Sequence, residues 1–275
     1  MKINNQNKAT TDKEQVSSQS KEAPDKEQAD SPKAIVVTGL SKQYPDKTAV
    51  DNISFSVDKG SIFSLLGVNG AGKTTTIKML CGLTRPTGGE AYVLSRDIHT
   101  ELGEVKKLVN ISPQDTSVAS RLTVRENLEF IAGIYGADRK KQREKADEMI
   151  QYFHLQEVAD RRAKVLSGGW QRKLSIAMAL ITEPQIIFLD EPTLGLDVLA
   201  RRELWEVIRR MKEKITIILT THYMEEAESL SDKVAVMVDG QIKAMGSVEE
   251  LKEQTGADNL EEAFVRIAQE GGARS

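Results

Sequence analysis

GVNGAGKTT, at residues 67–75, matches the pattern G-x-x-x-x-G-K-[ST] in full. It comprises Gly67, Val68, Asn69, Gly70, Ala71, Gly72, Lys73, Thr74 and Thr75. The run Ser61–Leu66 before it predicts a β-strand, and a helix is expected from Lys73 to about Leu83. Because strand, glycine-rich loop and helix in this order form a unit of α/β proteins, the segment predicts an α/β fold.

The residue types of this segment suit the binding of a polyphosphate. Backbone N–H groups must reach the phosphates, and the absence of side chains at Gly67, Gly70 and Gly72 leaves room for that approach. The start of the helix adds partial positive charge, Lys73 adds a full charge at the terminal phosphates, and the Thr74 hydroxyl can coordinate Mg²⁺. A glycine-rich turn can match so short a pattern by chance, but the surrounding strand and helix favour a nucleotide site.

The composition is that of an ordinary globular protein, with 39% hydrophobic and 29% charged residues in a chain of 275. A formal net charge of -3 shows no basic excess, so we expect no nucleic-acid partner. Cys81 is the single cysteine of the sequence and lies in an apolar stretch. It is therefore expected to be a small buried side chain rather than a reactive thiol.

No stretch of the sequence predicts a membrane span, which needs about 20 mostly apolar residues. The longest candidate, Leu174–Leu189, is interrupted by Glu183 and Pro184. No apolar run follows a basic start at the N-terminus, so no secretory signal is expected. Any action at a membrane would then require a membrane-embedded partner.

Three parts are expected along the chain. Residues 1–33 are rich in Lys, Gln, Ser, Asp and Glu without an aromatic residue, so they predict a disordered polar N-terminal tail. Residues 34–246 are expected to form one globular domain with a helical subdomain at about 115–165. Residues 247–275 are expected to form a short helical C-terminal tail.

Hydrophobic spacing predicts the individual elements. Thr123 and Glu126 have the spacing of a capping box at the start of a helix, which Gly136 should end. Strands are predicted at 34–37, 53–57, 186–189, 215–220, 234–238 and 241–245, the last two paired as a hairpin around Asp239-Gly240. Further helices are predicted at about 146–153, after Gly169, at 199–211 and at 224–230.

The apolar strand predicted at 186–189 ends in two carboxylates, Asp190 and Glu191. Adjacent residues of a strand point to opposite sides, so these carboxylates are expected to have different roles. Asp190 is suited to hold Mg²⁺, and Glu191 to orient or deprotonate an attacking water. By itself, a carboxylate pair at a strand end usually lies in a solvated turn without a function. The phosphate loop upstream favours the functional interpretation here.

A second glycine motif, Leu166-Ser167-Gly168-Gly169-Trp170, precedes an amphipathic helix. It resembles the LSGGQ signature of the ABC ATPases, with Trp170 in place of the usual glutamine. The resemblance extends from about Ile35 to Ala268, with the other landmarks of that family in the expected order. These landmarks are Tyr44, Gln114 in Ser-Pro-Gln, Asp197 in Gly-Leu-Asp, and His222. Singly, each could be an ordinary surface aromatic, loop amide, carboxylate or histidine.

The resemblance implies an α/β fold, namely the P-loop NTPase core of an ABC ATPase with an antiparallel β subdomain and an inserted α-helical subdomain. In that family two cassettes stack head to tail, and each ATP lies between the phosphate loop of one and the signature of the other. Ser167, Gly168 and Gly169 would then grip a γ-phosphate across the interface, in agreement with bare N–H groups at a helix start.

The resemblance also implies roles for single residues. Glu191, His222 and Gln114 are the expected catalytic residues, with His222 at the γ-phosphate and Gln114 sensing Mg²⁺ and coupling to a membrane partner. Tyr44 is expected to stack on adenine, and Asp197 to line the dimer interface. The expected magnesium ligands are Thr74, Gln114 and Asp190. Gln171 follows the atypical Trp170, but one position further along a helix it should point elsewhere and need not compensate.

The sequence around the motifs resembles the ATP-binding subunits of ABC-2-type exporters. The resemblance implies Mg²⁺-dependent ATP hydrolysis, a separate integral membrane permease as partner, and a peripheral location on the cytoplasmic side of the cell membrane. A second ATPase protomer, identical or related, is expected to complete the dimer. Two alternatives stay open: a soluble ABC ATPase without a transport role, and a switch that binds ATP without cleaving it, against which Glu191 and His222 argue.

Overall fold

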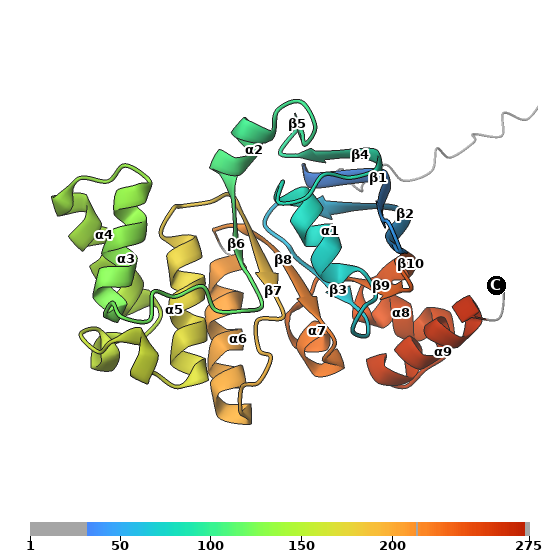
Figure 1. Cartoon of the computed structure of the whole chain (residues 1–275). Coiled ribbons are helices and arrows are strands. Elements are labelled where there is room, and N and C mark those ends of the chain that lie inside the picture. The colour runs from blue at the N-terminus through green and yellow to red at the C-terminus, as the bar shows by residue number, and fades with distance from the viewer. Residues whose placement is uncertain (1–31, 213, 273–275) are drawn as a thin grey trace, which may run out of the picture. The chain divides into compact units, whose positions relative to one another are not determined.

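A six-stranded sheet runs through the residues that the computed structural model describes, 32–212 and 214–272 (Figure 1). Its strand order is β10-β9-β3-β8-β7-β6; all neighbours are parallel except β10, which pairs antiparallel with β9. The strands span Ile62–Leu66 (β3), Val109–Ser112 (β6), Ile186–Asp190 (β7), Thr216–Thr221 (β8), Lys233–Val238 (β9) and Gln241–Gly246 (β10). The strands β3, β7 and β8 are buried throughout, which explains the nearly continuous apolar sequences of β3 and β7; β8 is apolar at its centre and has buried threonines at its ends.

A second sheet is antiparallel and has the order β2-β1-β4-β5. Its strands span Lys33–Tyr44 (β1), Lys47–Asp58 (β2), Gly88–Val93 (β4) and Arg96–Asp97 (β5). Helix α1 (Lys73–Leu80) lies between the two sheets (Figure 1). Its buried Ile77, Met79 and Leu80 belong to one apolar cluster with side chains of β1, β2, β3 and β7. The packing of α1 against both sheets fixes the position of the glycine-rich loop that precedes it.

A group of helices forms the other side of the domain, beyond the edge strand β6 (Figure 1). Thr123 accepts a hydrogen bond from the Glu126 N–H while the Glu126 carboxylate accepts one from the Thr123 N–H, which confirms the predicted capping box. Apolar residues of α3, α4 and α5 share one buried cluster. The elements here are α3 (Val124–Ile134), α4 (Arg139–Tyr152), the 3₁₀ helices η1 (Gln156–Val158) and η2 (Ala163–Val165) and α5 (Gly168–Leu180), whereas α2 (Leu102–Leu108) lies beside β5 and α6 (Val198–Lys212) packs against β8.

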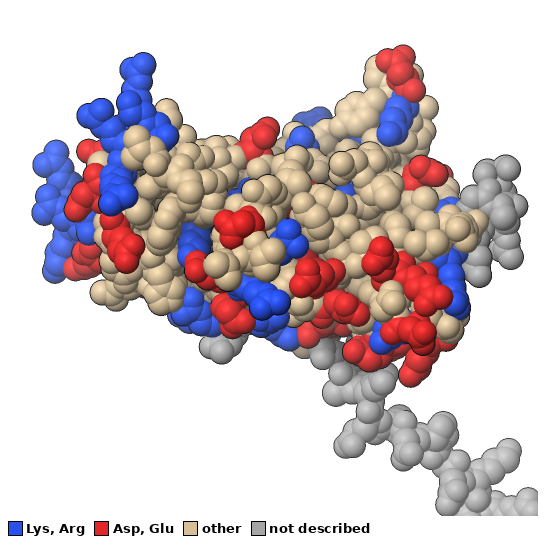
Figure 2. Space-filling model, turned by 90° about the horizontal axis from the view of Figure 1, so that it is seen from below, with Lys and Arg blue, Asp and Glu red and all other residues tan. Residues whose placement is uncertain are grey.

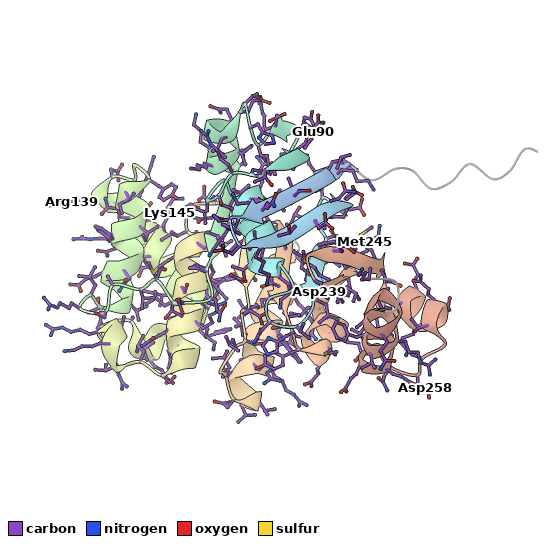
Figure 3. The ribbon with its side chains drawn as sticks, turned by 45° about the vertical axis from the view of Figure 1, so that its right-hand side comes forward. Glu90, Arg139, Lys145, Asp239, Met245 and Asp258 are labelled. Atoms are coloured by element: carbon purple, nitrogen blue, oxygen red, sulfur yellow. The ribbon has the colours of Figure 1, made fainter. Side chains whose placement is uncertain are left out.

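The C-terminal elements are α7 (Met224–Leu230), α8 (Val248–Thr255) and α9 (Leu260–Gly272). Leu251 of α8 and Leu260 of α9 are buried in the same cluster as Val234 and Val236 of β9. Helices α8 and α9 therefore pack against β9, the first strand of the β9–β10 hairpin. Figure 3 labels Asp239 at the hairpin turn and Asp258 between α8 and α9.

The bounds of several elements differ from the sequence prediction. Residues 1–31 of the predicted tail lie outside the described part, and Lys33, also assigned to the tail, is the first residue of β1. The strands β1 and β2 extend beyond their apolar cores because backbone pairing continues as far as Tyr44 and Lys47. Helix α1 ends before the predicted Leu83, since Gly82 has a left-handed φ of 66°.

The charged side chains of the described surface gather by sign (Figure 2). In this view Lys and Arg collect on the side of α3 and α4, and Asp and Glu collect on the opposite side, that of α8 and α9. The exposed basic residues of α4 include Arg139, Lys140, Lys141 and Arg143, beside the exposed acidic Glu144, Asp147 and Glu148, and the exposed acidic residues of α8, α9 and the turn between them include Glu249, Glu250, Glu253, Asp258 and Glu261. Among the described helices, none is both long and apolar enough to span a bilayer.

Candidate nucleotide site

The glycine-rich loop lies where β3 meets α1, and its glycines are required for different reasons. A Cβ atom on Gly67 would lie 2.3 Å from the carbonyl oxygen of Met237, and one on Gly72 would lie 2.4 Å from that of Ala49. These two glycines therefore admit close backbone packing of the loop against β9 and β2, a reason that the sequence does not reveal. Gly70 has a left-handed φ of 85°, and a Cβ atom there would meet only the Lys47 ammonium, at 3.8 Å, so its position leaves room for the predicted approach of a phosphate.

Lys73 is almost completely buried at the base of the loop. Its ammonium group donates hydrogen bonds to the carbonyl oxygens of Gly67 (2.7 Å) and Val68 (3.3 Å). It also forms an ion pair with Glu191, 3.1 Å from Oε1. The cation thus occupies the floor of the loop and neutralises a carboxylate that is itself only 6% exposed. An anionic ligand in the loop would compete with Glu191 for this charge.

The two carboxylates at the end of β7 have separate partners, as expected, but the reason is a turn and not the alternation of a strand, because β7 ends at Asp190 and Glu191 follows it with a left-handed φ. Asp190 accepts hydrogen bonds from the hydroxyls of Thr74 (2.9 Å) and Thr220 (2.6 Å). Glu191, with a left-handed φ of 48°, turns away and accepts a hydrogen bond from Nδ1 of His222 at 2.8 Å. The Thr220 hydroxyl also accepts from the Glu191 N–H at 3.0 Å, so it holds both acidic residues in place.

A cavity of about 430 Å³ opens over the loop and contains most of the predicted residues. Its lining includes the loop residues Asn69 to Thr75 together with Tyr44, Gln114, Glu191 and His222; Lys47, Ala49 and Leu194 complete it. Tyr44 lies at the rim with 42% of its surface exposed, and the Lys42 ammonium is 5.0 Å from the centre of its ring. Val68 is directed outward and is 53% exposed, so its side chain is not part of the cavity.

Oxygen donors in this region suit a small hard cation. The Thr74 hydroxyl and the Asp190 carboxylate are already within 2.9 Å of each other, and the Gln114 side chain lines the same cavity. Hydroxyl, carboxylate and amide oxygens, completed by water and phosphate, are the ligands that Mg²⁺ prefers. The donor set therefore fits the predicted magnesium ligands.

The residues of the second glycine motif do not join this cavity. Ser167 and Gly168 are exposed at the start of α5, and the Ser167 side chain makes no capping hydrogen bond. Asp197 is also exposed, where its carboxylate accepts hydrogen bonds from the N–H groups of Leu199 and Ala200 and so caps α6. Within one chain, the predicted signature residues and the phosphate loop are therefore not brought together.

The residue that departs from the signature pattern has a structural role of its own. Trp170 packs against the helical cluster, with the Lys173 ammonium 4.8 Å from its ring centre. Gln171 donates hydrogen bonds from its amide to the carbonyl oxygens of Ala163 (3.1 Å) and Leu166 (3.3 Å). The expectation that Gln171 points elsewhere is confirmed, since its amide is held by the loop before α5.

Two residues close to the site are not predicted from the sequence. Thr220 links Asp190 and Glu191, and the buried Arg172 donates hydrogen bonds to four backbone carbonyl groups around the site. Neither belongs to a glycine or acidic motif: Thr220 lies on another strand than the carboxylate that it contacts, and the backbone acceptors of Arg172 leave no trace in residue types. Cys81 is buried as predicted, and this burial raises the pKa of its thiol.

Fold and site together define the class: a P-loop nucleotide-binding domain with an inserted helical region. The family model described as ABC transporter matches residues 50–194. The daunorubicin/doxorubicin resistance ATP-binding protein DrrA of Streptomyces peucetius is 40% identical over 229 residues, covering 83% of this chain and 69% of DrrA. A solved structure of an ATP-binding subunit of an ABC transporter is 29% identical, with a TM-score of 0.75, and covers 85% of this chain and 99% of that chain.

Other relatives are considerably longer than this chain. The probable multidrug ABC transporter ATP-binding protein YbhF of Escherichia coli strain K12 is 41% identical over 234 residues, which are 83% of this chain and 40% of YbhF. The chain belongs to the ABC transporter family, as an ATP-binding cassette domain.

Proposed function

We propose that the chain binds and hydrolyses ATP as the energy-supplying subunit of an exporter, dimerising on ATP to drive a separate integral membrane permease from the cytoplasmic side. The names of the relatives support this assignment, since DrrA is a drug-resistance ATP-binding protein and YbhF a probable multidrug transporter component. The second protomer is another copy of this chain or a related cassette.

One observation carries the proposal: the site is half complete. The phosphate loop, Glu191 and His222 surround one cavity, whereas Ser167 and Gly168 are exposed elsewhere on the same chain. Exposed N–H groups at the start of a helix of this length are suited to bind an anion. Two chains stacked head to tail would satisfy both halves, because each signature would cover the loop of the other.

The contacts of Lys73 indicate how binding prepares the site. A triphosphate in the loop would draw the Lys73 ammonium from the carbonyl groups of Gly67 and Val68 and from Glu191. The Glu191 carboxylate, freed from its cation, then becomes available to accept a proton from the attacking water. His222, which donates a hydrogen bond to Glu191 through Nδ1, is placed at the cavity wall to contact the γ-phosphate.

Thr74, Asp190 and Gln114 would hold Mg²⁺, which supplies charge neutralisation at the phosphates when bound. The Thr220 hydroxyl holds the Asp190 carboxylate and the Glu191 backbone in fixed positions relative to each other during turnover. Tyr44 at the rim supplies a flat surface for the adenine ring. Loss of the γ-phosphate would remove the bridge between the loop and Ser167 of the second protomer, and the dimer could open.

Purification of the full chain from membranes, followed by reconstitution with the integral membrane protein that accompanies it, tests the proposal. We expect ATP hydrolysis by the pair in lipid vesicles and ATP-dependent movement of a substrate across the bilayer. Hydrolysis that continues unchanged without any membrane protein, together with association with ribosomes, would favour the soluble alternative. ATP binding without hydrolysis in every assembly would favour the non-hydrolysing switch.

A further inference from the structure

Arg172 lies in the first turns of α5, shortly after the exposed Ser167 and Gly168, yet it is only 4% exposed. Its guanidinium group donates hydrogen bonds to carbonyl oxygens of two separate parts of the chain. The acceptors are Pro113 (2.5 Å from Nη1), Gln114 (3.2 Å from Nη1), Asp190 (2.5 Å from Nη2) and Pro192 (2.9 Å from Nε). One side chain therefore joins α5 to the segment of Gln114 and to the end of β7.

The chemistry of arginine is required at this position. A buried cation is destabilising unless its donors are satisfied, and the planar guanidinium group here uses its rigid geometry to reach four acceptors at once. Burial lowers the pKa of Arg172 to about 10, and the carboxylates of Asp190, Glu226 and Glu191 oppose that shift. The group remains protonated at neutral pH. A lysine ammonium at the same place could not span the same set of carbonyl groups.

The joined segments belong to different halves of the proposed composite sites. Gln114 and Asp190 serve the site on the chain's own phosphate loop, whereas α5 carries the signature that the chain offers to a second protomer. A shift of the Gln114 backbone or of the end of β7 must therefore move the first turns of α5 or break hydrogen bonds of Arg172.

The neighbouring Lys173 provides a contrast on the same helix. It is also buried, at 6% exposure, but its ammonium pairs with Glu203 of α6 at 2.8 Å and lies over the ring of Trp170. None of these contacts reaches the phosphate cavity. Burial of a cation in α5 is thus not sufficient to link the helix with the site. The link depends on the direction of the Arg172 side chain, which points to the segments of Gln114 and Asp190.

We propose that Arg172 is a positioning residue that couples the chain's own ATP site to the signature segment it presents to the second protomer. Occupation of one site is transmitted through the carbonyl groups of Gln114 and Asp190 to the start of α5, and so to the other site of the dimer. This inference rests on the proposed function, since it requires two composite sites.

Arg172→Lys and Arg172→Met, with Lys173→Met as the matched control, test this coupling in the full chain. ATP affinity of the isolated protomer should stay within about twofold of wild type, because Arg172 does not line the phosphate cavity. The hydrolysis rate of the dimer should fall roughly 100-fold, as expected when reacting groups are misplaced by about 1 Å. The Hill coefficient for ATP should fall to about 1, since the two sites would act independently. Lys173→Met should retain the wild-type Hill coefficient.

A purely structural role would give a different pattern. If Arg172→Lys keeps the hydrolysis rate and Hill coefficient of wild type, the coupling role is refuted. The inference is also refuted if ATP affinity, hydrolysis and thermal stability fall together in Arg172→Lys while the Hill coefficient is unchanged. Should Arg172→Met fail to fold, Arg172→Lys alone decides between these results. Absence of hydrolysis by wild type would contradict the proposed function itself, whereas normal behaviour of wild type and Arg172→Lys alike contradicts only the coupling.

Discussion

Glu191 forms contacts with both a cation and a histidine at the end of β7. The carboxylate pairs with Lys73 at 3.1 Å and with His222 at 2.8 Å, and its own exposure is only 6%. A carboxylate held by these two contacts is not free to accept a proton from a water. The proposed exchange of Lys73 from Glu191 to a phosphate resolves this conflict, because it would couple the arrival of the substrate to activation of the base.

Glu191→Gln should abolish turnover while ATP binding is retained. The amide keeps the shape of the side chain but cannot accept the proton, so the hydrolysis rate should fall by about 100- to 10,000-fold, the contribution of a positioned general base. The ATP-bound dimer should accumulate, because the γ-phosphate is no longer removed. Phosphate release and size-exclusion chromatography with Mg-ATP measure the two effects, and unchanged hydrolysis would refute the role of Glu191.

Lys73→Ala should lose hydrolysis and most of the affinity for ATP. The substitution removes the cation at the base of the loop and leaves the buried Glu191 carboxylate with His222 as its partner. The negative charge of Glu191 then repels an incoming phosphate. Lys78→Ala is the matched control, since Lys78 lies on the same helix but is exposed. Isothermal titration should show weakened binding for Lys73→Ala only. Wild-type kinetics in that variant would exclude the proposed contact with the phosphates.

Many of the site residues could be predicted because each lies in a contiguous motif or at the end of a recognisable strand. Lys73, Thr74, Asp190 and His222 are of this kind, and the structure brings them to one place. Thr220 and Arg172 could not be predicted, because their partners lie far away in the sequence: Thr220 contacts the Asp190 carboxylate and the Glu191 N–H, and Arg172 contacts backbone carbonyl groups. The reason for Gly67 also stayed hidden, since it depends on the carbonyl of Met237 on another strand.

At the scale of elements, the start of α5 differs from its interior in exposure. Its interior is buried among the helices and the central sheet, while its first residues, Ser167 and Gly168, are exposed. The Ser167 hydroxyl accepts no hydrogen bond from the first turn, so it does not stabilise the helix as a cap. A serine at this position without a capping bond is available for contact with a ligand.

Ser167→Arg should therefore separate binding from turnover. The bulky cation would block the approach of a second protomer, so ATP hydrolysis should be lost, whereas ATP binding to the isolated protomer should be largely kept. The thermal unfolding midpoint should stay close to wild type because no cap hydrogen bond is removed. Binding and turnover are measured on the same preparation. Normal dimer-dependent hydrolysis in this variant would count against the composite site.

Elements with strong apolar periodicity or a capping signal were predictable, and those without were not. The capping box at Thr123, the buried β7 and the hairpin at Asp239 are confirmed. The elements β4, β5, α2 and β6 are not predicted from the sequence. The strand β5 spans only Arg96–Asp97, and β4 begins at Gly88, so their formation depends on pairing with distant strands rather than on local pattern.

At the scale of the whole molecule, one buried carboxyl group makes folding stability depend on pH. Glu226 of α7 is fully buried and accepts a hydrogen bond from Nε1 of Trp205 at 3.1 Å. Burial raises its pKa above the ordinary value, the charge of Glu191 adds to this shift, and the hydrogen bond from Trp205 opposes it. The folded state therefore holds this proton more tightly than the unfolded state does.

Glu226→Gln should consequently change the pH dependence of unfolding. In wild type, the contribution of Glu226 is most favourable below its unfolded pKa of 4.5 and is lost as the pH rises to the raised folded value. Glutamine does not titrate, so the variant should gain stability relative to wild type as the pH rises through that window. Glu228→Gln, an exposed carboxylate on the same helix, is the control. Urea unfolding at acidic and neutral pH measures the free energy of unfolding of both proteins. If the difference between Glu226→Gln and wild type is the same at both pH values, the raised pKa of Glu226 is contradicted.

The account depends on ATP being held by two chains at once, and a structure of Glu191→Gln with Mg-ATP measures this directly. The decisive quantity is the distance between the Ser167 Oγ atom of one protomer and the γ-phosphate bound at Lys73 of the other. We predict hydrogen-bond contact, about 3 Å. If Ser167 lies far from every γ-phosphate in every assembly, while the wild-type protein hydrolyses ATP normally, the composite site is contradicted.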